Sequence, residues 1–441
     1  MLLLHGGTVV LEGPTVSNVK AINAAAGISA DRVAVFAKDG TALAPASVDV
    51  TSIGYAKIVV SEPAPTPVEG AVRAVSVGGV TLDSATTSTT NASFDPITGT
   101  LTLTGDVGAI SASGGKLIIN VDEPSTVSGS GATNALRMVD GEVEICGDSK
   151  LTATAGSDSY VIKIIASQAD KTVGLTLSGD ASLDVITAKV ALHISGELNP
   201  GTTASLILNT SGSSNLTRQG GNAAVLLEKA DNINCYVKNG THNVSVTGAG
   251  NNHNRTFRLG NHDASVKNTV NEKITFHISG GSLTVSGKGG TSAAVGTKTE
   301  YSGIVGLDGG EGSTMTVSGG QLTVTANNAS YDVAAIYFEN VAVALNGGIV
   351  TAQAAGNGKA FYGDTDLSSG ATLALGEGMM AIASSGNSLI AAEDLLTVSY
   401  AKVEKERTLP PASVTVAGVV LNATNPTTTN ASYDPSTGIL T

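Results

Sequence analysis

The sequence predicts an all-β protein whose chain winds into a parallel β-helix, a solenoid in which each coil adds one rung to a stack of strands. Short runs in which apolar residues alternate with small or polar ones follow one another along most of the chain. This alternation is the period of a strand with one buried face. Corners of small residues separate the runs. The 54 glycines and the 14% of charged residues disfavour long helices, which use Leu, Glu, Lys and Arg.

The corners are clearest in three segments of the second half of the chain, each of which reads strand, corner, strand. The segments are residues 274–287, 314–326 and 341–354, with the corners Ser-Gly-Gly, Ser-Gly-Gly and Asn-Gly-Gly. Gly281, Gly320 and Gly348 mark the corners, so neighbouring corners lie 320 − 281 = 39 and 348 − 320 = 28 residues apart. This recurrence predicts a repeating rung.

Two of the runs resemble each other enough to be interpreted as stacked rungs of one sheet. Residues 189–196 read KVALHISG and residues 273–280 read KITFHISG. The alternation predicts that His193 and His277 point outward from the same sheet. The residues predicted to point inward are Val190, Leu192, Ile194, Ile274, Phe276 and Ile278.

A longer repeat crosses the whole chain. Residues 91–102 read NASFDPITGTLT and residues 430–441 read NASYDPSTGILT, with nine of twelve positions identical at an offset of 430 − 91 = 339. The tripeptide YAK occurs at 55–57 and 400–402, and GGTV at 6–9 recurs as GGIV at 347–350. The chain is therefore predicted to be a window on a tandem array. Arrays of large β-rich units serve reach, display and adhesion more often than catalysis.

These matches and two linkers predict five segments. The Pro-rich stretch SEPAPTPVEG at 61–70 is expected to be stiff and extended, and EKERTLPP at 404–411 follows the second YAK strand in the same way. The predicted segments are the C-terminal part of a preceding repeat (1–62), a linker (63–71), a complete β-helix repeat (72–405), a linker (406–411) and the N-terminal part of a following repeat (412–441). Within the complete repeat, residues of about 74–104 and 360–405 are the predicted caps for the open ends of the solenoid.

An array of β-sandwiches is the main structural alternative, because sandwiches also consist of short alternating strands. Sandwich units usually run to about 100 residues, whereas the offset between the matching segments is 430 − 91 = 339. Several sandwiches hidden within one such period remain the alternative to the solenoid.

Charge and hydropathy exclude several classes of partner. The net charge of −13 opposes nucleic acid, which is bound by clustered Lys and Arg, and it opposes anionic membranes. No apolar run approaches the roughly 20 residues of a membrane helix, so we expect no membrane insertion. The composition favours an extracellular or cell-surface location. The start, MLLLHGG, is too short for the core of a secretion signal, which is therefore expected upstream.

The two cysteines, Cys146 and Cys235, lie in strand-like runs. They are predicted to be buried free thiols that pack as small apolar residues. The sequence contains no CxxC pair and no His/Cys cluster, so no zinc site is expected.

The start and end of the repeat resemble a known family. The openings VSVGGVTL…NASFDPITGTLTL and VTVAGVVL…NASYDPSTGILT, and the close GKAFYGDTDLSSGATLALGEGMMAI followed by VSYAKVEKE, resemble β-helical domains of large surface proteins of Gram-positive gut bacteria. These domains are often labelled carbohydrate-binding-like. The resemblance implies a pectate-lyase-like, right-handed β-helix in an exported, wall-associated or fibrous bacterial protein.

No catalytic residues are predicted. The chain has no GHG or NTD motif and no aspartate cluster repeated on successive rungs, and sugar cleavage by acid–base catalysis needs two carboxylates at a defined separation. The densest polar stretch, NNHNRTFRLGNHD at 251–263, is interpreted as a solvated loop with Phe257 and Leu259 buried, or alternatively as a loop that reads sugar hydroxyls. The candidate ligand surface combines this stretch with the scarce aromatics, and consists of Tyr301, Tyr337, Tyr362, His253, Arg255 and His262.

No cofactor is expected, with calcium as the alternative. The acidic, Gly-rich segments 306–313 (GLDGGEGS) and 363–370 (GDTDLSSG) offer oxygen ligands. Neither matches the EF-hand loop or the calcium-binding nonapeptide repeat. Turn chemistry explains their Asp and Gly equally well.

The function that the sequence favours is a non-catalytic, extracellular structural or adhesive repeat module, a rod or fibre-forming surface protein. Its expected partners are adjacent copies of itself or neighbouring repeats, joined head to tail into a filament, together with cell-surface or host glycans. A gene fragment cut at arbitrary positions is the alternative to the filament. The alternative functions are a carbohydrate-binding module and, third, a polysaccharide lyase or hydrolase.

Overall fold

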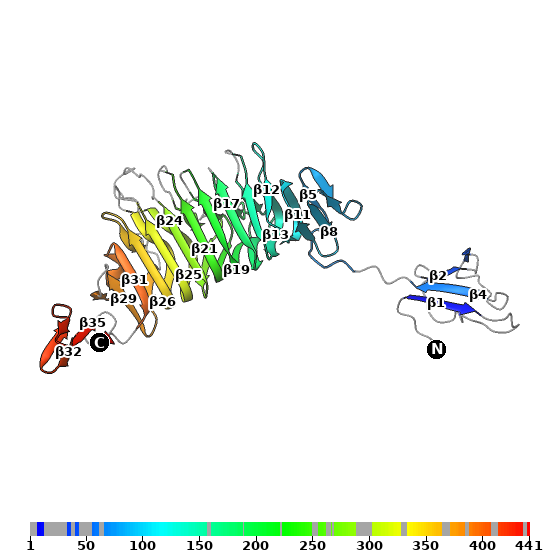
Figure 1. Cartoon of the computed structure of the whole chain (residues 1–441). Helices are drawn as coiled ribbons and strands as arrows, with labels where there is room; N and C mark the ends of the chain where they lie inside the picture. The colour runs from blue at the N-terminus through cyan, green and yellow to red at the C-terminus, as the bar shows by residue number, and fades with distance from the viewer. Residues whose placement is uncertain are drawn as a thin grey trace. The chain divides into compact units, whose positions relative to one another are not determined.

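The alternating runs close into a parallel β-solenoid of about seven turns, and the described residues lie largely in strands, with one short 3₁₀ helix near the end of the solenoid (Figure 1). The predicted fold class is therefore confirmed. The computed structural model divides the chain into two units, Met1–Pro67 and Val68–Thr441, which are described separately below; the finer division into five segments stays a prediction. The structure describes residues 7–12, 33–36, 40–43, 55–60, 66–156, 160–187, 189–220, 223–248, 255–261, 266, 269–287, 302–327, 333–363, 371–383, 388–406, 413–434 and 439–441.

Each turn of the solenoid contributes a strand to three faces, here called A, B and C. Some strands lie on one face, and the longer ones pass around a corner; β25 (Ser302–Ala326) and β26 (Val333–Ala354) visit all three faces. Within each face the strands pair in parallel with the turns before and after. Because each rung pairs with the next, only the two ends of the stack carry unpaired edges.

Four long strands pass from one face to the next. Strands β11 (Ile110–Val121) and β13 (Leu136–Gly147) lie on faces C and B. Strands β19 (Thr203–Arg218) and β21 (Asn232–Val246) lie on faces B and A. The remaining strands of face A are β10 (Val107–Gly108), β12 (Ser125–Ser128), β14 (Lys150–Thr154), β17 (Ser182–Thr187) and β24 (Ser282–Gly287). Those of face B are β9 (Thr100–Leu103), β16 (Thr172–Gly179), β23 (Lys273–Ile278) and β28 (Thr372–Leu375). Those of face C are β15 (Ile162–Ile165), β18 (Leu192–Ser195), β20 (Val225–Glu228), β22 (Phe257–Gly260) and β27 (Lys359–Gly363).

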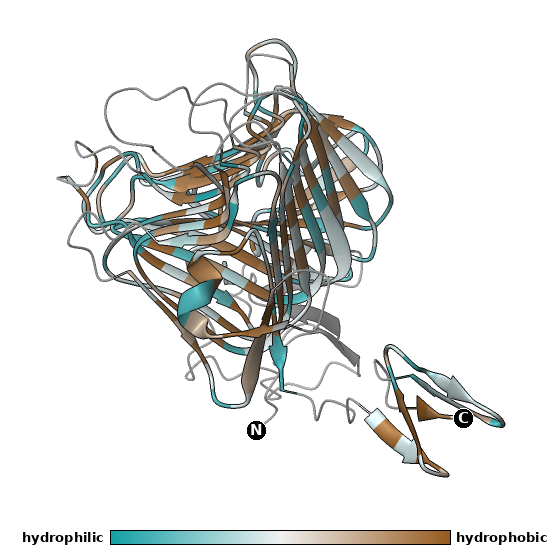
Figure 2. Cartoon of the chain, turned by 90° about the vertical axis from the view of Figure 1, so that its left-hand side faces the viewer, coloured by the Kyte–Doolittle hydropathy of each residue, from teal (hydrophilic) through white to brown (hydrophobic). Residues whose placement is uncertain are grey.

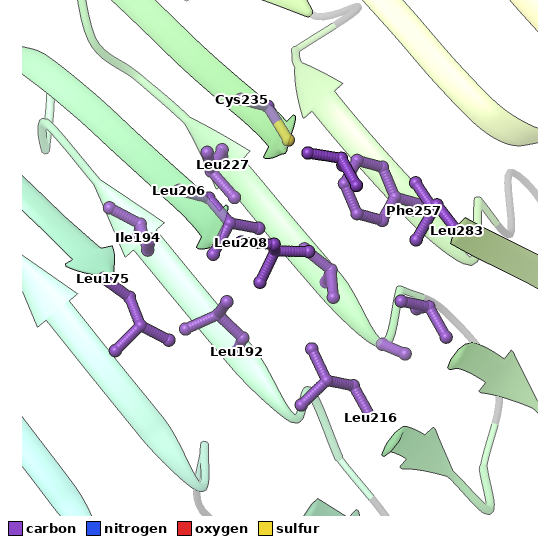
Figure 3. Close-up of a cluster of buried hydrophobic side chains, with 14 of the residues drawn as sticks. Leu175, Leu192, Ile194, Leu206, Leu208, Leu216, Leu227, Cys235, Phe257 and Leu283 are labelled. Atoms are coloured by element: carbon purple, nitrogen blue, oxygen red, sulfur yellow. The ribbon is translucent and has the colours of Figure 1, made fainter. Parts of the chain in front are cut away.

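The interior is a continuous column of aliphatic side chains from all three faces. Apolar and polar residues alternate along the strands (Figure 2), and the apolar ones point into the space that the faces enclose. In Figure 3, Leu206 from face B, Leu192 from face C and Leu216 from face A point into the same interior. The six residues predicted to point inward from 190–194 and 274–278 are buried, as predicted.

The two histidines correct one prediction. His277 lies on β23 of face B, whereas His193 lies on β18 of face C, so they do not share a face of the solenoid. His193 is also buried, with 4% of its surface exposed. The two runs resemble each other because every face needs the same inward alternation, and the pattern does not say which face a strand occupies.

The Gly-Gly corners stack directly on one another. Gly281, Gly320 and Gly348 all have a positive φ, between 65° and 69°, a region that only Gly enters readily. A Cβ on Gly320 would lie 2.6 Å from the backbone of Gly280 in the turn below, and a Cβ on Gly348 would lie 2.5 Å from the Gly320 carbonyl oxygen. Gly is therefore required both for the bend and for the close approach of successive turns.

The solenoid is capped at both ends, but the C-terminal cap begins later than the predicted 360, because β27 and β28 still pair in parallel with β26. At its N-terminal end, β5 (Val75–Val77), β6 (Val80–Leu82), β7 (Ser88–Thr89) and β8 (Ala92–Asp95) form antiparallel hairpins, and β5 and β9 pair with β11 of the first turn. At its C-terminal end, β29 (Met379–Ala383), β30 (Ser388–Ile390), the 3₁₀ helix η3 (Ala392–Leu396) and β31 (Tyr400–Lys405) follow, and β31 pairs antiparallel with β26. Antiparallel strands of this kind end the parallel ladder.

The N-terminal unit has the strand pairing of the C-terminal cap. Its strands β1 (Gly7–Glu12), β2 (Val33–Phe36), β3 (Ala42–Leu43) and β4 (Tyr55–Val60) run in the order β1-β4-β2-β3. The cap has the order β26-β31-β29-β30. The register agrees as well, since Val9 opposes Ile58 where Val350 opposes Val403. The short sequence matches therefore mark a shared topology.

The C-terminal segment has the strand pairing of the N-terminal cap. Its strands are β32 (Ser413–Val416), β33 (Val419–Asn422), β34 (Thr427–Thr428), β35 (Ala431–Asp434) and β36 (Ile439–Leu440). The matching opposed pairs, 339 residues apart by 414 − 75, are Val75–Leu82 with Val414–Leu421 and Phe94–Leu101 with Tyr433–Leu440. Even the positive φ of Asn91, 63°, recurs at Asn430 as 69°.

No helix among the described residues has the length and hydropathy needed to cross a membrane.

Candidate functional site

The most unusual surface of the solenoid is the outward side of face C, where charged and aromatic side chains are buried. Register places His193, Leu226, Arg258, Gly306, Tyr337 and Tyr362 in one column along successive turns. A second column ends the strands with Gly260, Asp308 and Glu339, and Glu228 likewise ends β20. We call Glu228, Arg255, Arg258, Asn261, Glu272 and Asp308 the corner cluster, because they gather where face C turns toward face B.

Arg255 contacts a residue of each column, Tyr337 in the first and Asp308 in the second. Gly306 has no side chain, and a Cβ there would lie 2.1 Å from the Arg255 Cδ, so the glycine makes room for the arginine. The Arg255 guanidinium lies over the Tyr337 ring, 4.6 Å from its centroid, and forms an ion pair with Asp308. Asp308 is fully buried. A buried carboxylate of this kind is tolerated only when a charge or hydrogen bonds compensate it.

The second half of the cluster is organised around Asn261. Its backbone N–H donates to Glu272 Oε2 at 2.8 Å, and its side-chain amide donates to Glu228 Oε2 at 3.1 Å. Arg258 donates to the Asn261 side-chain oxygen at 2.7 Å. The backbone N–H of Lys229 donates to Glu272 Oε1 at 2.6 Å. Two neighbouring turns of the solenoid thereby meet at one amide, because Glu228 and Lys229 follow β20 of one turn and Arg258, Asn261 and Glu272 belong to the next.

The two carboxyls of this half differ in their protonation. Burial raises the pKa of Glu272 to about 7, and the charge of Glu228 adds to the increase, against the backbone N–H donors and Arg258. Burial also acts to raise the pKa of Glu228, but His193, Arg258 and Lys229 outweigh it and the pKa is lowered. Near neutral pH Glu228 is therefore ionised while Glu272 titrates.

Two carboxyls with separated pKa values are also the pattern of an acid–base pair. Here Glu272 has no exposed surface and Glu228 is buried. The hydrogen bonds of both carboxyls go to neighbouring turns, so the arrangement stabilises a corner of the solenoid.

The structure brings together some of the predicted ligand residues. Tyr337 and Tyr362 stack on neighbouring turns with their ring centroids 5.9 Å apart, and Arg255 covers Tyr337. Tyr337 is buried, so Tyr362 provides the exposed part of the pair. The other three predicted residues, Tyr301, His253 and His262, lie outside the described residues.

Two other predictions need correction. Residues 255–261 do not belong to a solvated loop, because they contain β22 and Arg255 is buried, although Phe257 and Leu259 are buried as predicted. Cys235 is a buried free thiol as predicted, but Cys146 is only half-buried on the outward side of β13. Alternation explains the difference, since Cys146 follows the inward Ile145.

The predicted calcium segments are part of other structures. Residues 306–313 lie within β25, and Asp308 is committed to Arg255; residues 364–370 of the second segment lie outside the described residues. Among the described residues, no three His, Cys, Asp or Glu side chains are grouped to hold a metal ion.

Sequence reasoning missed the corner cluster because its members come from separate segments of the chain, with Glu228 and Asp308 on either side of the stretch from Arg255 to Glu272. A signal was present nonetheless. The runs LLE at 226–228, GLD at 306–308 and YFE at 337–339 each place an acidic residue after an inward apolar one at the end of a strand. An acidic residue repeated at strand ends predicts stacked carboxyls, which need buried cations between them.

Two surface grooves of the described residues lie at the N-terminal end of the solenoid. One, of about 430 Å³, is lined by charged residues that include Glu69, Lys116, Asp140 and Glu142. The other, of about 410 Å³, lies on the N-terminal cap and is lined largely by hydroxyls: Thr87, Ser88, Ser93, Thr98, Thr100 and Thr102, with Asp95 and Phe94. We call the second one the hydroxyl groove.

No protein-family model, no curated protein and no solved structure matches this chain. The β-solenoid is therefore the level at which the resemblance to pectate-lyase-like domains is supported.

The ion pair of Asp308 predicts a large stability difference between two similar substitutions. Asp308→Asn removes the carboxylate that pairs with buried Arg255 and should lower the free energy of unfolding by about 3 kcal/mol. The matched control is Asp184→Asn, which removes the partner of Lys150 at 3.1 Å on an exposed face and should cost less than about 1 kcal/mol. Urea denaturation measures both; equal losses would contradict the role of the corner cluster.

Glu272 predicts a pH dependence of stability with a definite sign. Its folded-state pKa, about 7, lies above the ordinary value of 4.5 for a glutamate, so the folded state binds the proton more tightly than the unfolded state. The penalty for ionising it is absent below about pH 4.5, grows between 4.5 and 7, and reaches roughly 3 kcal/mol above that.

The free energy of unfolding of the wild type should therefore fall across this pH window relative to that of Glu272→Gln, which cannot ionise. Denaturation curves of the two proteins from pH 4 to 8 measure the difference. Parallel pH profiles would show that Glu272 does not titrate in the folded protein as described.

Proposed function

We propose that this chain is a non-catalytic structural and adhesive repeat module of an exported bacterial surface protein. The observation that carries the proposal is that cap topologies recur on both sides of the capped solenoid: the N-terminal unit pairs like the C-terminal cap, and the C-terminal segment pairs like the N-terminal cap. A series of capped solenoids extends a chain by a fixed length per unit. The acidic charge and Thr-rich surface are consistent with an extracellular location.

The construction of the solenoid suits a strut. Its interior holds aliphatic side chains throughout the stack, and side-chain ladders tie the outside of face A together. Asn243 donates to Asn215 at 2.9 Å, Asn215 donates to Asp184 at 2.7 Å, and Lys150 pairs with Asp184. Separating two neighbouring turns on face A therefore has to break side-chain contacts as well as the hydrogen bonds between the strands.

A carbohydrate-binding module is the second candidate, and the hydroxyl groove favours it. Sugar hydroxyls are recognised by convergent polar groups in a concave surface, and six Thr and Ser residues line this groove. Thr100 and Thr102 stand on β9 with Phe94 beside them. Thr100→Val together with Thr102→Val removes two hydroxyls while keeping the side-chain shape, and loss of glycan-array signals in this variant would support the second candidate.

The proposed function predicts the absence of turnover together with mechanical resistance. Incubation of the chain with pectin-like and other cell-wall polysaccharides should release no reducing ends or unsaturated products. Force spectroscopy on the chain held by its two ends should show the solenoid unfolding at high force, after the linkers have extended. Product release that Glu228→Gln or Glu272→Gln abolishes, in variants with an unchanged circular-dichroism spectrum, would contradict the proposal and make the corner cluster a catalytic site.

A further inference from the structure

The C-terminal segment is folded like the N-terminal cap, and among the described residues no strand of a solenoid turn pairs with it. Its internal packing matches that of the N-terminal cap, because Leu421 and Tyr433 are as buried as their counterparts Leu82 and Phe94. The surface that faces the first turn differs. Leu101 has no exposed surface, whereas its counterpart Leu440 is 50% exposed.

The contacts that bury Leu101 come from β11. Strand β9 pairs in parallel with β11 so that Leu101 is the partner of Ile119 and Thr102 is the partner of Asn120. Strand β5 pairs antiparallel with the start of the same strand, with Val77 opposite Ile110. A segment with the same two strands in the same register presents the same surface to β11.

We propose that Ser413–Leu440 of one copy caps the first turn of a second copy of this chain, in place of that copy's own Val75–Leu103. This exchange of caps links the copies head to tail. The proposal deepens the structural function proposed above and rests on it. The occupant is a second copy, since the contact already exists within each chain and the two segments share nine of twelve residues at 91–102 and 430–441. The exchange repeats an established interface and needs no new surface.

The link between the solenoid and the C-terminal segment is too short for the segment to reach the first turn of its own chain. The C-terminal segment follows the last strand of the solenoid, and about seven turns at roughly 4.8 Å each separate the two ends by about 34 Å. The link of residues 406–412 spans at most about 25 Å even when fully extended. The exchange is therefore intermolecular, and because it is heterologous it gives an open filament.

The C-terminal segment of a second copy has to compete with the resident N-terminal cap for the first turn, and this competition determines when exchange occurs. The resident cap is tethered to its own first turn at an effective concentration of about a millimolar, typical of short links. Exchange therefore requires opening of that cap, during folding or by local unfolding, and a high local concentration of copies such as a cell surface provides. A dilute preparation that has never been unfolded should be monomeric.

Cross-linking tests the predicted register. Thr441 is the counterpart of Thr102 by 441 − 102 = 339, so Thr441 should be the partner of Asn120 in a second copy. The variant Asn120→Cys, Thr441→Cys in a Cys146→Ala background, which removes the thiol beside Asn120, is unfolded and refolded at high concentration and then oxidised mildly. A ladder of disulfide-linked oligomers is expected on a non-reducing gel. The control Asn243→Cys, Thr441→Cys, whose first thiol is on face A away from β11, should give none.

A second pair of variants keeps the test decisive. Leu101→Asp weakens the resident cap and should raise the oligomer fraction at least severalfold at equal concentration, and adding Leu440→Asp should abolish it. If Leu101→Asp fails to fold, the cross-linking experiment decides alone. Absence of oligomers from the refolded cysteine variant, or equal cross-linking in its control, overturns cap exchange. Either result would leave the proposed structural function standing. Polysaccharide turnover would contradict the proposed function but would not bear on cap exchange.

Discussion

The whole chain depends on parallel register between successive turns. A single turn cannot bury its inward side chains or pair its backbone groups, and it does both only against the turns before and after it. Leu206 illustrates the arrangement, since it is buried between neighbours on its own face and is the partner of Leu175 on one side and Cys235 on the other. Glycine corners such as Gly320 permit the close approach that this register requires.

The same constraint makes the ends of the stack important. An exposed end presents unpaired backbone and apolar surface, so each end needs a cap that changes from parallel to antiparallel pairing. Both cap types occur twice in this chain, once against the solenoid and once without a turn paired to it among the described residues. Cap exchange and a tandem array are two uses of one interface, and they differ only in whether the neighbouring turn belongs to the same chain.

Much of the architecture could be predicted from alternation alone, because inward residues such as Phe276 and Ile194 follow a period of two. The face that a strand occupies could not, since the turns vary in length and every face has the same inward pattern; His193 and His277 show this. The corner cluster was hidden for a different reason. Arg255 reads as part of a polar loop until Gly306 and Asp308 are brought beside it from another turn.

The register is tested most directly by a pair of cysteines on neighbouring turns of face A, in the Cys146→Ala background. Asn215 and Asn243 are partners in register, so Asn215→Cys, Asn243→Cys should form a disulfide in the folded monomer under mild oxidation. Asn215→Cys, Ser245→Cys is displaced by two residues, beyond the separation of about 7 Å that a disulfide bridges, and should stay reduced. Cross-linking of the displaced pair in preference to the aligned one would contradict the solenoid described here.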